Sequence, residues 1–150
     1  MTDIDQMIRF DRWANLQSIA ALKKSSVENQ RASSICGHIA GINEMWLTRA
    51  EGESATLGAW PDLTLAEAEE WIDRLSARWH KLIERVPNEL MLTYCDSRGL
   101  KRENSLTELV QEVVLHASHH RGQIALLLRM SDHEPPVSTD FIPAARMKLF

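Results

Sequence analysis

The sequence predicts an all-α fold, specifically a four-helix bundle. Apolar residues recur every three or four positions in four separate segments, which is the period of a helix with one buried face. Only one short segment alternates as a strand would, so no second layer of β-sheet is expected. The chain has 150 residues, of which 44% are hydrophobic and 25% charged, and we predict one globular domain over residues 1–150.

The first helix is predicted over residues 3–25, with Thr2 or Asp3 as its N-terminal cap. Its stripe consists of Met7, Phe10, Ala14, Gln17 and Ala21. Asn15 lies in the middle of this helix, although asparagine is a mediocre helix former. We expect its side chain to face solvent or to make an interhelical hydrogen bond, and the alternative is a role in a polar site.

The second helix is predicted over residues 31–50 and ends before Gly52. His38 belongs to its apolar stripe, so this histidine is expected to point toward the core. Residues 52–63 then form a connection that is longer than is usual between helices of a bundle. Such a connection can cross the end of the bundle or cover a pocket.

The third helix is predicted over residues 65–86, because Thr64 and Glu67 have the spacing of a capping box. His80 lies one position off the apolar stripe of this helix, and we expect it to be exposed and not to bind a metal. Residues 90–100 alternate between apolar and polar side chains before a turn. They predict a short hairpin or an extended crossover.

The last long helix is predicted over residues 105–130, again from a capping box, formed here by Ser105 and Glu108. The tail that follows begins with Pro135-Pro136, which favours an extended backbone. Residues 144–149 could add one or two helical turns at the end of the chain.

Three histidines from two predicted helices face the core. His116 and His120 are four residues apart, so they lie one above the other on the last long helix, and His38 lies on the second. Buried imidazoles need partners, and one divalent ion satisfies a nitrogen on each ring. Three histidine ligands leave a coordination position open on an ion such as Zn²⁺ or Ni²⁺, which is the pattern of a catalytic site.

Neighbouring residues could complete this site. Gln123 falls on the same helical face and could orient a histidine ligand, while Glu112 could do the same or supply a fourth, oxygen ligand. His119 is rotated to the flank of the site. We expect Arg121 to form a salt bridge or an interface contact on the flank of the helix. Gly122 lowers helix stability, so we expect a close approach there, either by a neighbouring helix or by a substrate.

Composition excludes several other classes of function. The net charge is −4 and the basic residues are scattered, so nucleic acid is not an expected partner. There is no run of 18 apolar residues and no basic leader before an apolar segment, so we expect no membrane association and a cytoplasmic location. Cys36 and Cys95 are predicted to be reduced thiols. Ala117 stands where an H-E-x-x-H peptidase has its glutamate.

The run His116-Ala-Ser-His-His120-Arg-Gly-Gln123 resembles the H-x-x-x-H-R-G-Q signature of the DinB/YfiT-like family. The resemblance extends over essentially the whole chain in the family's order. Its other pieces are Trp13-Ala14-Asn15, His38, Glu44, Trp46-Leu47, Trp60-Pro61, Tyr94, Gly99, Pro135-Pro136 and Asp140-Phe141.

This resemblance implies a bundle of up-down-down-up topology, a homodimer, and one divalent ion, Zn²⁺ or Ni²⁺, bound by His38, His116 and His120. His119 occupies a neighbouring position that varies in type within the family. The resemblance also implies a thiol-dependent transferase that joins a low-molecular-weight thiol, such as bacillithiol, mycothiol or glutathione, to a small electrophile. A related amide hydrolase activity exists in the same family.

The leading functional hypothesis is therefore a metal-dependent thiol S-transferase. A metal-dependent hydrolase is the second hypothesis, although Glu112 or a spare histidine is the only base available to it. The third is a non-catalytic metal-binding protein of the stress response, whose closed coordination sphere would include Glu112 or another side chain. The last is a set of core histidines that bind no metal.

Overall fold

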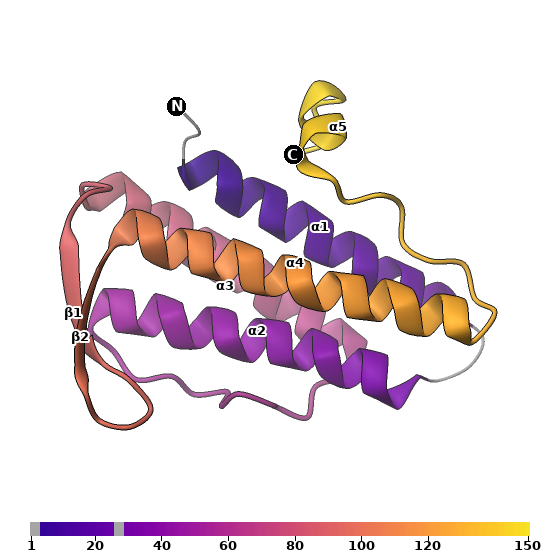
Figure 1. Ribbon diagram of the computed structural model, residues 1–150, viewed down its shortest axis with the longest axis horizontal. Coiled ribbons are helices and arrows are strands. Elements are labelled where there is room, and N and C mark those ends of the chain that lie inside the picture. Colours follow the sequence, from indigo (N-terminus) through magenta and orange to yellow (C-terminus); the bar gives the residue numbers. More distant parts are fainter. Residues whose placement is uncertain (1–3, 26–28) are drawn as a thin grey trace.

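The computed structural model describes residues 4–25 and 29–150 and confirms the all-α four-helix bundle. Within those residues the chain forms four long helices, one short helix and one β-hairpin (Figure 1). Their bounds are α1 Ile4–Lys24, α2 Gln30–Glu51, α3 Leu65–Arg85, β1 Met91–Cys95, β2 Lys101–Ser105, α4 Leu106–Met130 and α5 Phe141–Arg146. The expected caps Thr2 and Asp3 lie outside the described residues.

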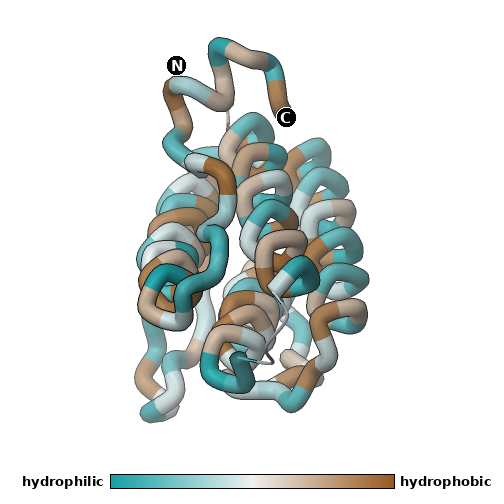
Figure 2. Tube along the Cα trace, turned by 90° about the vertical axis from the view of Figure 1, so that its right-hand side faces the viewer, coloured by the Kyte–Doolittle hydropathy of each residue, from teal (hydrophilic) through white to brown (hydrophobic). Residues whose placement is uncertain are grey.

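The topology is up-down-down-up. In Figure 1, α1 and α4 run in one direction while α2 and α3 run in the opposite one, and the hairpin closes one end of the bundle. Helices α1 and α2 each pack against both α3 and α4. Hydrophobic and hydrophilic segments alternate within the turns of each helix (Figure 2), as expected for helices that bury one face.

Local signals in the sequence set the helix ends. Thr64 and Glu67 form a complete capping box at the start of α3, and Ser105 and Glu108 form another at the start of α4, as predicted. Asn29 caps α2 by accepting a hydrogen bond from the backbone N–H of Ala32. None of the described helices has a stretch apolar and long enough to cross a bilayer.

The core is apolar, with a few hydrogen-bonded polar groups. Trp79 is fully buried, and its indole N–H donates to Oδ1 of Asn43 at 2.8 Å, which joins α3 to α2. Cys36 is also buried, and burial raises the pKa of its thiol to about 12, so it is an inert packing residue. The sequence prediction for His80 was wrong: the ring is partly buried because it bonds to Asp5 of α1.

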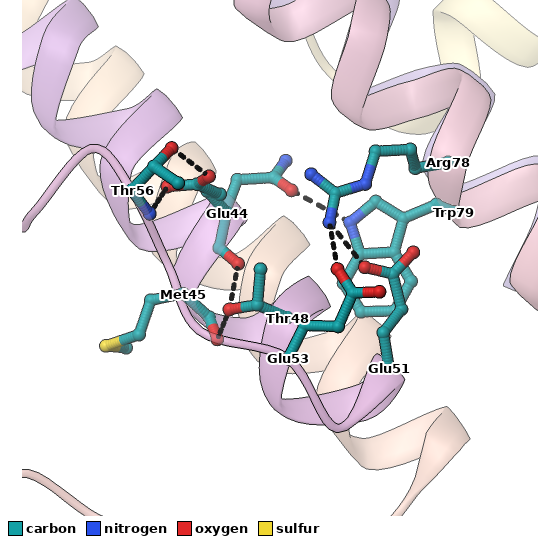
Figure 3. A network of polar contacts seen from close by, with 9 residues as sticks. Glu44, Met45, Thr48, Glu51, Glu53, Thr56, Arg78 and Trp79 are labelled. Carbon is teal, nitrogen blue, oxygen red and sulfur yellow. Dashed lines mark hydrogen bonds and ion pairs between the residues drawn. The ribbon is translucent and has the colours of Figure 1, made fainter.

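Residues 52–64 connect the parallel helices α2 and α3, so they run back along the outside of α2 (Figure 1). Arg78 of α3 pairs with Glu51 at the end of α2 and lies 3.9 Å from Glu53 at the start of the connection. Figure 3 shows Arg78 reaching these two carboxylates. The long connection therefore runs along a face of α2, and it does not simply cross the end of the bundle.

Candidate metal centre

Three predicted site residues meet between α2 and α4. One ring nitrogen each of His38, His116 and His120 lies within 4.8 Å of the other two. The ring centroids are separated by 5.0 Å between His38 and His116, 4.7 Å between His38 and His120, and 4.5 Å between His116 and His120. His38 is buried, and the other two rings are half-buried. The inward face predicted from helical spacing is confirmed for all three.

The spacing of the two α4 histidines suits a metal ion. Their Nε2 atoms are 3.2 Å apart. Nitrogen ligands of a tetrahedral Zn²⁺ lie about 2.0–2.1 Å from the ion, which places them ~3.3 Å from one another. The group could therefore hold a divalent ion. The set is made of imidazoles alone, which suit zinc, nickel and similar ions.

Hydrogen bonds fix the tautomers of two of these rings. Nδ1 of His38 lies 2.6 Å from the carbonyl oxygen of Ala59, which can only accept, so Nδ1 carries the proton. Nδ1 of His120 lies 2.7 Å from Oε1 of Gln123, which also accepts. When either ring is neutral, its Nε2 then carries a lone pair and no proton. Histidine ligands of metals in proteins are oriented in this way, by a hydrogen bond from the ring nitrogen that does not bind the metal.

Electrostatics favour the unprotonated form of His116 and of His38. Burial, followed by the charges of His120, His38 and His119, lowers the pKa of His116 to about 4. Burial also lowers the pKa of His38; its hydrogen bond to Ala59 opposes the shift, and the charge of His120 adds to it. Metal binding needs neutral imidazole, so these two ligands hold no competing proton near pH 7.

Trp60 covers one face of the site. Its ring stacks on the ring of His38 at a centroid separation of 3.8 Å and an interplanar angle of 11°, while its side chain stays 60% exposed. The connection can lie this close because α2 has glycines beneath it. A Cβ at Gly41 would lie 2.2 Å from the carbonyl oxygen of Gly58, and one at Gly37 would lie 2.7 Å from that of Pro61.

Glu44 fastens the connection one helical turn further along α2. Its side chain is buried and accepts three hydrogen bonds: from the N–H of Thr56 at 2.9 Å, the hydroxyl of Thr56 at 2.7 Å and the N–H of Leu57 at 2.7 Å. Figure 3 shows the Glu44 carboxylate pointing from the helix to Thr56. The sequence indicated Glu44 only through the family resemblance.

The remaining candidates lie around the three histidines. Gln123 makes the expected contact: its Oε1 accepts from His120, and its amide nitrogen lies 3.3 Å from Nε2 of His119. His119 is exposed, with its ring centroid 5.1 Å from that of His120. Glu112 is exposed on α4 and is not part of the histidine group.

Arg121 lies outside this group, in a buried polar network between α4 and α1. Its Nη1 donates to Oδ1 of Asp11 at 2.9 Å and to Oδ1 of Asn15 at 2.8 Å. Asn15 in turn donates to Oδ2 of Asp11 at 2.9 Å. The salt bridge and the interhelical hydrogen bond expected from the sequence are both present, but they are buried. No neighbouring helix makes the close approach expected at Gly122, because no described atom lies within 4 Å of a Cβ built there; approach by a substrate stays a prediction.

A cleft of about 750 Å³ opens beside the site. The cleft is lined by His120, Gln123 and Trp60 of the site or its cover, and by Gln30, Arg31, Ser34, Ile35, Leu126 and Leu127. Arg31 is exposed and is the one lining residue, among those described, with a permanent charge. The cleft thus combines an apolar wall, neutral polar groups and a single cation.

Fold and site together define the class of protein: a four-helix bundle with a three-histidine group that could hold a metal ion. The sequence matches the model of the DinB family over residues 6–146, and the chain therefore belongs to the DinB family. This confirms the family resemblance. Comparison with curated proteins gave no match, and comparison with solved structures gave none.

Sequence reasoning missed two groups, one at the histidine site and one in the network of Arg121. The first is the carbonyl oxygen of Ala59, which no side-chain pattern can reveal. The second is Asp11, which Arg121 binds across 110 positions of sequence. A usable signal did exist for the connection, because Gly37 and Gly41 put two small residues on one face of α2 and so indicate a close neighbour.

Proposed function

We propose that this protein is a divalent-metal-dependent enzyme that binds Zn²⁺ or Ni²⁺ through His38, His116 and His120 and transfers a small thiol to an electrophile. The observation that carries this proposal is the convergence of three imidazoles, two of them with Nδ1 against an outside acceptor. A bound ion would act as a Lewis acid and lower the pKa of a thiol at its open position.

The protein's own residues account for the rest of the site. Ala59 and Gln123 orient two of the rings, and Trp60 shields His38 from water on one face. No carboxylate belongs to the described group, and the exposed position of Glu112 supports an open site over a closed one. This favours catalysis over purely structural metal binding.

The cleft supports a small substrate with an apolar body. Ile35, Leu127 and Trp60 offer apolar contact, and Arg31 offers a cation to an anionic group on the substrate. In the proposed reaction the thiolate sulfur forms a bond to an electrophilic carbon, a leaving group such as chloride departs, and the thiol proton passes to solvent.

The test is an assay of metal-loaded protein with glutathione or another small thiol and a chlorinated aromatic electrophile, beside a His116→Ala control. Release of chloride should require thiol, metal and the intact histidine. Equal rates in the wild type and the variant would remove the proposal. Turnover of an amide or ester without thiol would instead support the hydrolase alternative.

Metal binding without turnover of either kind would support the third hypothesis, a non-catalytic stress-response protein. The homodimer implied by the family resemblance stays a prediction, and light scattering of the purified protein tests it. A mass near twice the 17.1 kDa of one chain is the expected result.

A further inference from the structure

The connection between α2 and α3 touches the histidine site with two groups and is fastened to α2 away from it. At residues 59–60 it supplies the carbonyl that accepts from His38 and the indole that stacks on the same ring. Three positions earlier it is fastened by the Glu44 carboxylate. The residues that Glu44 binds and the residues that contact His38 thus belong to one short segment, residues 56–60.

We propose that Glu44 is a positioning residue of the histidine site, which holds the connection in the register that places the Ala59 carbonyl on Nδ1 of His38. The inference rests on the proposed metal site and deepens it. Glu44 touches none of the three histidines in the contacts described above, so it acts through the backbone of residues 56–59.

The geometry leaves little freedom between anchor and site. The Thr56 and Leu57 N–H groups bind the same oxygen of Glu44, at 2.9 Å and 2.7 Å, and Glu44 is 2% exposed. From Leu57 the backbone reaches Gly58, whose φ of +73° lies in the left-handed region that glycine favours. Ala59, two residues after Leu57, supplies the carbonyl oxygen that accepts from Nδ1 of His38.

Loss of the Glu44 hydrogen bonds should therefore allow the neutral ring of His38 to populate both tautomers. Without the Ala59 acceptor, the proton of the neutral ring can move to Nε2, the nitrogen that a metal would need. Groups that orient a histidine ligand in this way typically change metal affinity about 10–100-fold when they are removed.

The decisive comparison uses Glu44→Ala, Glu44→Gln and the control Asn43→Ala. In the glutamine variant the amide oxygen can still accept from Thr56 and Leu57, while the amide nitrogen donates to the Thr56 hydroxyl, so the anchor is kept. Asn43 is the adjacent residue on α2 and is also buried, but it bonds to Trp79 of α3 and not to the connection.

Two readouts are measured on folded protein: the tautomer of His38 in metal-free samples by ¹⁵N NMR, and zinc affinity by competition with a chelator. Wild type, Glu44→Gln and Asn43→Ala should keep the Nδ1–H form. Glu44→Ala should populate both tautomers and bind zinc about 10–100-fold more weakly. Unchanged tautomer and affinity in Glu44→Ala, or an equal loss of affinity in Asn43→Ala, would overturn the inference.

If Glu44→Ala does not fold, Thr56→Val removes one of the three hydrogen bonds and should shift both readouts in the same direction, with affinity at least about threefold weaker. No change in either readout would overturn the inference. A tautomer shift in a protein whose wild type binds no zinc would leave the positioning role standing and remove the proposed metal function.

Discussion

The Nε2 atoms of His116 and His120 lie 3.2 Å apart on successive turns of α4, and His38 of α2 completes the group. Burial and the neighbouring histidines lower the pKa of His116 to about 4. Near neutral pH His116 is therefore an uncharged nitrogen donor. Three properties of the cluster can be measured: the effect of pH on stability, the effect of a larger residue at Gly41 on metal affinity, and the metal content of the protein.

Acid should destabilise the metal-free protein through His116. Its pKa is about 4 when folded and near 6.5 when unfolded, so between these values the unfolded chain binds more protons. Stability should be unaffected by this residue above pH 6.5, fall as the pH drops from 6.5 toward 4, and level off below. Because the ring is half-buried, we expect a loss of about 1–2 kcal/mol at pH 5.

Urea denaturation of wild type and His116→Gln, both with chelator at pH 7.5 and pH 5, checks this. The variant should lose less stability on acidification than the wild type. The same loss in both proteins would show that His116 is not the group responsible.

Gly41→Ala should damage the site, whereas Gly122→Ala should not. A methyl group at Gly41 would lie 2.2 Å from the Gly58 carbonyl oxygen, so the connection must move away from His38. At Gly122 nothing described lies within 4 Å, so alanine should stabilise α4 by about 0.5–1 kcal/mol. Zinc affinity should fall at least about tenfold in the first variant alone. Equal affinities in both would contradict the close packing of the connection.

The Asp11–Arg121 pair should respond unequally to loss of its two members. Burial outweighs the attraction of Arg121 and raises the pKa of Asp11 to about 6, so this carboxyl can take up a proton if Arg121 is removed. The guanidinium cannot lose its proton in return. Asp11→Asn should therefore destabilise by about 3–5 kcal/mol, more than Arg121→Met. Urea denaturation of both variants at pH 6 measures their free energies of unfolding. A larger loss in Arg121→Met than in Asp11→Asn would contradict this account.

Arg31→Ala should weaken the use of anionic substrates specifically. The residue is exposed, so its contact with a substrate carboxylate is worth less than about 1 kcal/mol, or roughly fivefold in KM. A chlorinated nitrobenzoate and its methyl ester form the matched pair of electrophiles, and Arg129→Ala, outside the cleft, is the matched variant. KM for the acid should rise in Arg31→Ala only. Equal changes for acid and ester would remove Arg31 from substrate recognition.

The sequence predicted what depends on local periodicity and capping. The four helices, the hairpin and both capping boxes follow from the spacing of a few neighbouring residues, such as Ser105 and Glu108. The convergence of His38 with the α4 pair followed from their positions on apolar faces. These features require no knowledge of how distant segments meet.

Features that depend on tertiary contacts could not be predicted. The Ala59 carbonyl carries no side-chain signal, and its contact with His38 depends on the path of a whole connection. His80 was expected to be exposed because Asp5, its partner, lies 75 positions away. Gly122 has no structural partner among the described residues, so its presence in α4 is not explained by packing.

The most direct test of the metal site is elemental analysis of tag-free protein purified without added metal. The comparison is wild type, a His116→Ala and His120→Ala double variant, and His119→Ala as the neighbouring control. About one equivalent of zinc or nickel per chain should be present in wild type and His119→Ala and absent from the double variant. Equal metal in all three, or none in any after reloading with zinc, would contradict the account.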